Sequence, residues 1–216
     1  TFFRQSGWLA LATAVGGAAS YAVHFFAQKM PEADYGVFTT LLQALNLVAI
    51  PAIGLQTVFA QQSAAAKNEA DEQQLAATVR VVSCWLFGLW VTAALVVLLL
   101  KTQIITSFNI HDPRALSLAM VASLFALWMP LAYGLLQGRQ NFLWYGWAAM
   151  LLGVVRLAVV AALLLMFSKN VTNAMWGVLA GILVAWVVAW RARDVQPTRS
   201  GTIFNWREWF RRVVPL

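Results

Sequence analysis

The stretch FLWYGWAAMLLGVVRLAVVAALLLMF, residues 142–167, holds 26 residues and one charged side chain, Arg156. A helix of about 20 apolar residues crosses the roughly 30 Å hydrocarbon core of a bilayer. Polar and apolar residues do not alternate here, as they would along a strand of a membrane barrel. Because a segment in lipid must pair its own backbone N–H and C=O groups, we predict a transmembrane helix.

Five further apolar runs flank this stretch and meet the same length test. They cover residues 7–27, 35–60, 81–100, 115–137 and 171–190. Asp112 followed by Pro113 predicts a helix start, and Asn170 is a candidate cap for the last run. Close helix packing is predicted at the small-residue pairs Gly134/Gly138 and Gly177/Gly181. The sequence thus predicts an all-α polytopic membrane protein in which residues 1–190 form a six-transmembrane-helix bundle.

The composition of the whole chain agrees with this assignment. Of its 216 residues, 61% are hydrophobic and 11% are charged. In soluble domains, about 45–50% of the residues are apolar and about 25% are charged. The net charge of +7 does not indicate nucleic-acid binding, because the basic residues lie at the ends of the apolar runs, where membrane topology signals lie. The single cysteine, Cys84, excludes a disulfide framework and a metal site built from several cysteines.

Lysine and arginine residues set the expected orientation. With the N-terminus inside, ten of them fall in inside segments and four in outside loops, which is a positive-inside bias. We therefore expect a multi-pass protein of the cytoplasmic (inner) membrane, with both ends in the cytoplasm. Residues 61–80 are rich in helix-forming Ala, Gln and Glu, so we predict that they extend the second and third spans as a solvated hairpin.

Residues 191–216 are expected to form a basic cytoplasmic tail. Within it, residues 205–214 place Trp206, Trp209 and Phe210 on one face and arginines opposite, which predicts an amphipathic helix in the membrane interface. The chain opens at Thr1 rather than at Met, and its tail leads toward a further span. We expect it to be part of a longer protein with a second lobe that is missing here.

Arg156 is the most informative polar residue, because it lies near the middle of the fifth span. A charge at that depth costs about 2.5–3.5 kcal/mol on insertion, so it needs a partner or a hydrated cavity. Gly146, Ala149, Gly153 and Arg156 follow at helical spacing and give one small face that carries the cation. We expect Arg156 to bind an anion in a central pathway; the alternative is a guanidinium bound to neighbouring carbonyls or hydroxyls.

Polar stripes also mark the first two spans. Thr13, Gly17, Ser20, His24 and Gln28 share one face of the first span, and Thr39, Gln43 and Asn46 share one face of the second. With Arg156, the candidate substrate-binding residues are His24, Ser20, Thr39, Gln43 and Asn46. An ordinary interfacial histidine is the alternative for His24. Pro51 and Gly54 are candidate hinge residues in the second span, with a static kink as the alternative.

The sequence also lacks several signatures. No Asp or Glu lies within the six predicted spans, whereas a cation-coupled antiporter usually needs a buried carboxylate. There is no catalytic triad pattern, HExxH motif or glycine-rich phosphate loop. We therefore predict no enzyme activity, no catalytic residue, no cofactor and no metal site.

Three segments carry a family resemblance: ADYGVFTTLLQ (residues 33–43), GLQTVFAQQSA (54–64) and YGLLQGRQNF (133–142), the last followed by an arginine in the fifth span. Their order resembles the polysaccharide-biosynthesis flippases, the O-antigen and capsule branch of the multidrug/oligosaccharidyl-lipid/polysaccharide exporter (MOP) superfamily. The resemblance implies the N-terminal lobe of a transporter with about 12 to 14 spans, in which two lobes face a central cavity.

The same resemblance implies a function. The protein is expected to flip lipid-linked oligosaccharide or polysaccharide precursors, whose anionic lipid pyrophosphate would be its partner, together with the lipid bilayer and glycan-assembly membrane proteins. No nucleic acid is expected as a partner. Two alternatives stay open: a drug or cation antiporter of the same superfamily, and a non-transporting membrane scaffold for glycan-assembly enzymes.

Overall fold

The computed structural model describes residues 2–193, which form α-helices joined by short turns. The helices are α1 (Phe2–Ala27), α2 (Glu32–Ala65), α3 (Glu69–Leu99), α4 (Lys101–Ser107), α5 (Pro113–Gly138), α6 (Phe142–Met166) and α7 (Val171–Ala192). All except α4 are long and apolar enough to cross a membrane, so the six predicted spans are confirmed. The predicted amphipathic helix at 205–214 lies outside the described residues.

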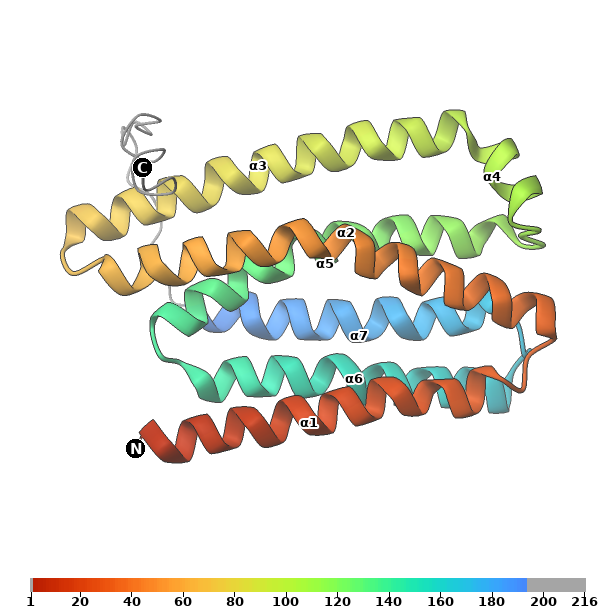
Figure 1. Ribbon diagram of the computed structural model, residues 1–216, viewed down its shortest axis with the longest axis horizontal. Coiled ribbons are helices and arrows are strands. Elements are labelled where there is room, and N and C mark those ends of the chain that lie inside the picture. The colour runs from red at the N-terminus through yellow and green to blue at the C-terminus, as the bar shows by residue number, and fades with distance from the viewer. Residues whose placement is uncertain (1, 194–216) are drawn as a thin grey trace.

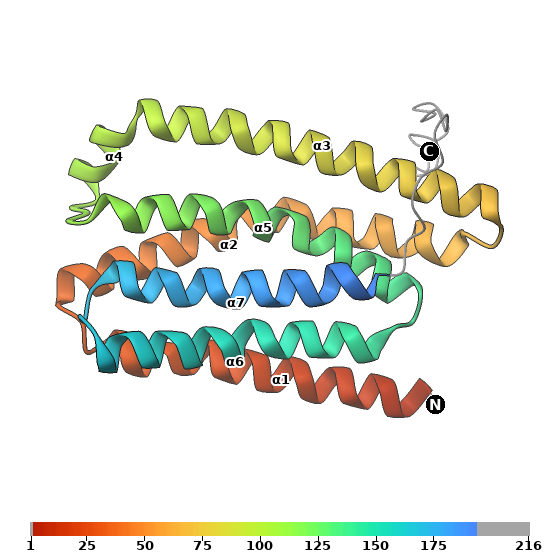
Figure 2. The same cartoon turned by 180° about the vertical axis from the view of Figure 1, so that it is seen from behind.

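The helices lie side by side as a bundle (Figures 1 and 2). α1 packs on α6, α6 on α7, α7 on α5, and α5 on α2. α3 lies at the edge of the bundle opposite α1, and α4 leads from the end of α3 to the start of α5. The α1–α2 and α6–α7 turns and α4 gather at one end; the α2–α3 and α5–α6 turns lie at the other. The loops thus fall into the two groups that the predicted topology requires.

α2 and α3 extend beyond the membrane thickness. α2 has 34 residues and α3 has 31, which correspond to about 51 and about 46 Å of helix against a hydrocarbon core of about 30 Å. Only residues 66–68 separate them, and the Asn68 side chain caps α3 by accepting from the Asp71 N–H at 2.8 Å. The predicted helical hairpin at 61–80 is therefore confirmed.

Carboxylate and amide caps fix the helix starts at the opposite end. Asp112 accepts from the Arg114 N–H at 2.9 Å, and Asn170 accepts from the Asn173 N–H at 2.9 Å, which confirms both predicted caps. Asp112 also accepts from the Thr172 hydroxyl at 2.8 Å, so one side chain joins the starts of α5 and α7. The Arg114 N–H and the Thr172 hydroxyl lower the pKa of the Asp112 carboxyl below its usual range.

Glycines let the helix backbones approach closely. A Cβ on Gly153 of α6 would overlap the Gly16 carbonyl oxygen of α1, and a Cβ on Gly138 of α5 would overlap the Ala60 carbonyl oxygen of α2. Gly177 and Gly181 of α7 lie equally close to α6. Membrane helices associate through such close contacts because lipid supplies no hydrophobic drive between them. The two predicted glycine pairs are therefore confirmed as packing sites.

We predict that Gly153→Ala destabilises the bundle by about 1–3 kcal/mol, because its new methyl group forces α1 and α6 apart. Reversible unfolding of the purified protein in detergent measures the change. Gly88→Ala in α3 is the matched control, since a Cβ there meets nothing within 4 Å, and it should not destabilise the bundle because alanine also favours helix. Equal effects of the two substitutions would contradict the packing argument.

We predict that His111 and Gln140 lie on opposite sides of the membrane, His111 outside and Gln140 inside. Both are exposed turn residues at opposite ends of the bundle. A membrane-impermeant maleimide, applied to intact cells expressing single-cysteine variants in a Cys84→Ala background, should label His111→Cys and not Gln140→Cys. Labelling of both from outside would contradict the bundle, and a reversed pattern would contradict the positive-inside orientation.

Candidate functional site

A cleft of about 600 Å³ lies between the α1–α6 pair and the α2–α5 pair, with α7 contributing Ile182 to its wall. Its lining is apolar apart from seven side chains that carry polar atoms. These are Ser20, Tyr21 and His24 of α1, Asn46 and Gln56 of α2, Tyr133 of α5 and Arg156 of α6. Four of the six predicted substrate-binding residues, Arg156, His24, Ser20 and Asn46, thus line one cleft.

Arg156 is the cation of the cleft. Its Nε atom is buried and has no hydrogen-bond partner, and its guanidinium makes no ion pair within the part of the chain that the structure describes. The Nε atom therefore has no carbonyl or hydroxyl partner within residues 2–193, and the anion-binding role of Arg156 stays a prediction. An unpaired cation that borders an open cleft can receive an anion.

The small residues before Arg156 pack against α1. A Cβ on Gly146 would lie 2.7 Å from the Trp8 Nε1 atom, and Gly153 and Ala149 lie against Gly16 of α1. Of the four residues on the predicted small face, Arg156 is the one that lines the cleft, next to Leu152 of the same helix.

His24 and Ser20 form the wall of the cleft toward its α1–α2 end. His24 Nδ1 lies 3.1 Å from the Tyr35 hydroxyl oxygen, at hydrogen-bond distance, and the two rings meet edge to face. Gln28 lies beyond His24, in a separate small pocket that His24 also lines. Thr13, the first residue of the predicted α1 stripe, lines neither of these two spaces. Its hydroxyl donates to the Leu9 carbonyl of its own helix.

The predicted polar face of α2 reaches the cleft only at Asn46. The Thr39 hydroxyl donates to the Gly36 carbonyl at 2.9 Å, and Gln43 is exposed; neither lines the cleft. Pro51 lies inside α2, which bends along its length (Figure 1), and it faces a second, apolar groove. A Cβ on Gly54 would meet nothing within 4 Å. The hinge role of Pro51 and Gly54 stays a prediction.

A polar network at the other end of the cleft escaped sequence reasoning. The Gln56 amide donates to Gln137 Oε1 and to the Tyr145 hydroxyl, both at 3.1 Å. The rings of Tyr133 and Tyr145 lie 4.6 Å apart, and the Tyr133 hydroxyl is buried with no partner in the described chain. The signal was present, since Gln56 interrupts an apolar run and three of the four residues lie in the motifs quoted above.

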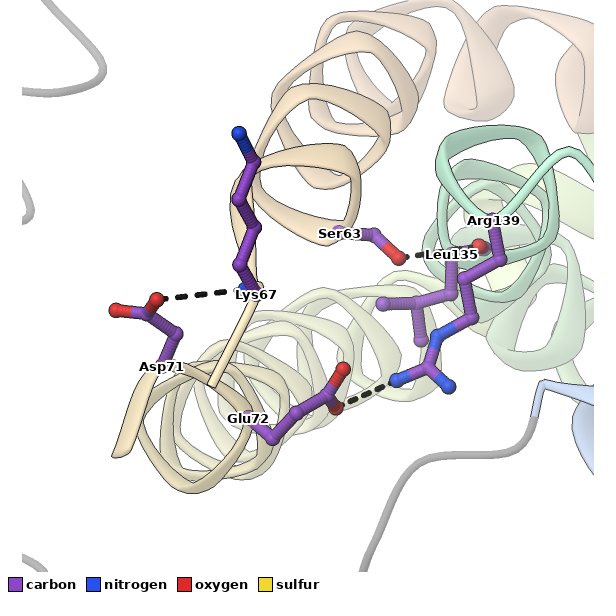
Figure 3. A network of polar contacts seen from close by, with 6 residues as sticks. All are labelled: Ser63, Lys67, Asp71, Glu72, Leu135 and Arg139. Carbon is purple, nitrogen blue, oxygen red and sulfur yellow. Dashed lines mark hydrogen bonds and ion pairs between the residues drawn. The ribbon is translucent and has the colours of Figure 1, made fainter. Parts of the chain in front are cut away.

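Beyond this network, α2, α3 and α5 are joined at their ends (Figure 3). Arg139 Nη2 donates to Glu72 Oε2 at 2.6 Å, and the Ser63 hydroxyl donates to the Leu135 carbonyl at 3.2 Å. The Lys67 N–H donates to Asp71 at the start of α3. These contacts hold the α2–α3 hairpin against the α5–α6 turn at the end of the bundle that carries Gln137.

The electrostatics of the cleft are one-sided. Arg156 supplies a positive charge, and no Asp or Glu is among the residues that line the cleft. The remaining polar groups are hydroxyls, amides and an imidazole, which donate and accept hydrogen bonds. The described site therefore suits a ligand that joins an anionic group to polar, hydroxyl-bearing groups.

No protein-family model matches the sequence, and no curated protein matches it. Among solved structures, the chain is similar to the outward-facing conformation of a multidrug resistance MATE family transporter of the MOP superfamily, with a TM-score of 0.72 at 13% sequence identity. The match covers 98% of this chain and 49% of that chain. The chain therefore spans about half the length of that transporter, and its helical bundle has the same fold as that half.

Proposed function

We propose that the protein belongs to a membrane transporter that flips lipid-linked oligosaccharide or polysaccharide precursors, as the O-antigen and capsule branch of the MOP superfamily does. The observation that carries this proposal is the unpaired Arg156 guanidinium at a cleft without a carboxylate. The likeness to one lobe of a solved transporter supports the transport part of the proposal, and the resemblance of three sequence segments supports the substrate part.

The chemistry of the cleft suits both ends of such a substrate head group. A guanidinium forms paired N–H···O bonds with a phosphate, and these charge-assisted bonds are about twice as strong as neutral ones. Asn46, Ser20 and His24 supply donors and acceptors for sugar hydroxyls along the same wall. The sugars would lie on the polar side of the membrane interface and the lipid tail on the apolar side, while the phosphate that joins them passes Arg156.

A drug or cation antiporter is the second candidate, because the solved transporter is a multidrug resistance protein. The two candidates differ in the sign of the charge that the site should hold. A cationic drug would be repelled by Arg156, and no carboxylate in the described cleft attracts it. A carboxylate in a facing lobe would reverse that balance, so transport assays must include both substrate types.

We predict that Arg156→Gln lowers flipping of a fluorescent lipid-linked oligosaccharide in proteoliposomes by about tenfold to a hundredfold, since a charged hydrogen bond contributes about 1.5–3 kcal/mol. Arg156→Lys should lie between that variant and the unaltered protein, because an ammonium keeps the charge and loses the paired geometry. Size-exclusion profiles should be unchanged, because Arg156 has no protein partner in the described structure.

Arg114→Gln is the matched control for these variants, since Arg114 is an exposed cation at a helix start, away from the cleft. It should flip lipid-linked sugar normally. Normal flipping by Arg156→Gln would contradict the proposal that Arg156 binds the substrate phosphate. Two results together would favour the antiporter. The unaltered protein would flip no lipid-linked sugar, and Arg156→Gln would export a cationic dye faster than the unaltered protein does.

We predict that Pro51→Ala keeps substrate binding and slows flipping by severalfold. Alanine restores the backbone donor that proline lacks and so stiffens α2 at its bend. Binding of the lipid-linked sugar and its flipping rate are measured on the same variant. Val58→Ala, two turns after Pro51 in α2, is a control for the loss of a few packing contacts. Equal flipping rates in Pro51→Ala and the unaltered protein would mean that the bend is static.

A further inference from the structure

A second cavity, on the far side of α2 from the cleft, is a groove of about 460 Å³ between α2, α3 and α5. Ala44 and Pro51 line it from α2, Ala93 from α3, Ala119 from α5, and Ile104 of α4 closes one end. Its polar lining groups are the Ser123 hydroxyl and the Trp90 indole, and these bond to each other at 3.0 Å. The lining is therefore almost wholly apolar, which suits hydrocarbon better than water.

The groove exists because α3 packs poorly along this part of its length. α3 is held at its start by the Glu72–Arg139 ion pair and farther along by Trp90, whose indole donates to the Met120 carbonyl of α5 at 3.0 Å. α3 makes few contacts with α2, and small residues such as Ala44 and Ala93 leave the space between them unfilled. An empty apolar space of this size forfeits dispersion contacts, so hydrocarbon is favoured to enter it.

The size of the groove restricts its occupant. A membrane-spanning helix is about 10 Å wide and about 30 Å long, so it could cover the groove but would not fill its depth. A flexible acyl chain does fit, because it can follow an irregular space that falls within the usual range of ligand pockets.

A cation lies beside the groove, in the chain between its lining residues Val97 and Ile104. Lys101 lies one turn before Ile104 on α4, so the two residues share a face of that helix. The Lys101 side chain is half-buried and makes no ion pair within residues 2–193. An ammonium without a counter-ion at the membrane interface attracts the phosphate of an anionic lipid.

We propose that the groove between α2, α3 and α5 binds one anionic phospholipid of the bilayer, with an acyl chain between α2 and α3 and its phosphate at Lys101. The lipid fills the space that protein side chains leave open and so holds the far half of α3 to the bundle. This site is separate from the cleft that contains Arg156, and the proposal does not depend on the transported substrate.

Native mass spectrometry of the delipidated full-length protein tests the proposal, with phosphatidylglycerol and phosphatidylcholine of equal chain length added back. The unaltered protein should retain one tightly bound phosphatidylglycerol and bind phosphatidylcholine about fivefold more weakly. Lys101→Gln should abolish that preference. Ala93→Trp, which fills the groove from α3, and Ala44→Phe, which fills it from α2, should remove the tight site for both lipids.

Two matched controls separate this site from general lipid contact. Lys169→Gln removes a cation from another turn at the same end of the bundle, and Ala158→Trp adds bulk at an exposed position of α6. Both should bind lipid like the unaltered protein. The proposal is overturned if Ala44→Phe folds and retains the lipid, if Lys169→Gln matches Lys101→Gln, or if delipidation yields dimers in place of a lipid-binding monomer.

Discussion

The backbone of α6 lies directly against the backbones of α1 and α7, and the geometry of the cleft follows from that double contact. Gly153 meets Gly16 on one side, and Gly181 of α7 faces the Leu152 carbonyl on the other. In lipid, such contacts depend on dispersion and close fit rather than on the removal of apolar surface from water. Arg156 follows Gly153 by one turn and lies beside Gly181, so this packing sets its depth and direction.

Because α6 is fixed in this way, Arg156 cannot move toward the membrane surface to escape lipid. Its charge must be balanced from within the cleft, by water, by a facing lobe or by a bound anion. No carboxylate lines the cleft beside it, and Gln56 bonds to Tyr145, whose ring packs on that of Tyr133. The described part of the chain therefore presents one strong electrostatic feature on a cleft wall that holds no carboxylate.

The spans, the caps and the hairpin could be predicted because each depends on local chemistry: apolar length, a capping side chain or helix propensity. Arg156 could be predicted as a site residue because a charge in lipid always needs an explanation. Which side chains of α2 face the cleft could not be predicted. Thr39, Gln43 and Asn46 share a helical face, yet only Asn46 lines the cleft, because the tilt and bend of α2 depend on its contacts with α5. The glycines before Arg156 had the right spacing, but spacing cannot say which neighbour a small face meets.

The register of α2 on α5 has a mechanical consequence. Gly134 lies against Gln56 and Gly138 against Ala60, so the two helices run parallel with a constant offset. That offset places Pro130 of α5 beside the turn of α2 that contains Pro51. Two adjacent helices thus each lack a backbone hydrogen bond at the same depth. Beyond that depth, the glycine contacts and the Arg139–Glu72 pair join the ends of α2 and α5 to the start of α3, so any bending of these two helices at their prolines would carry those ends together as one block.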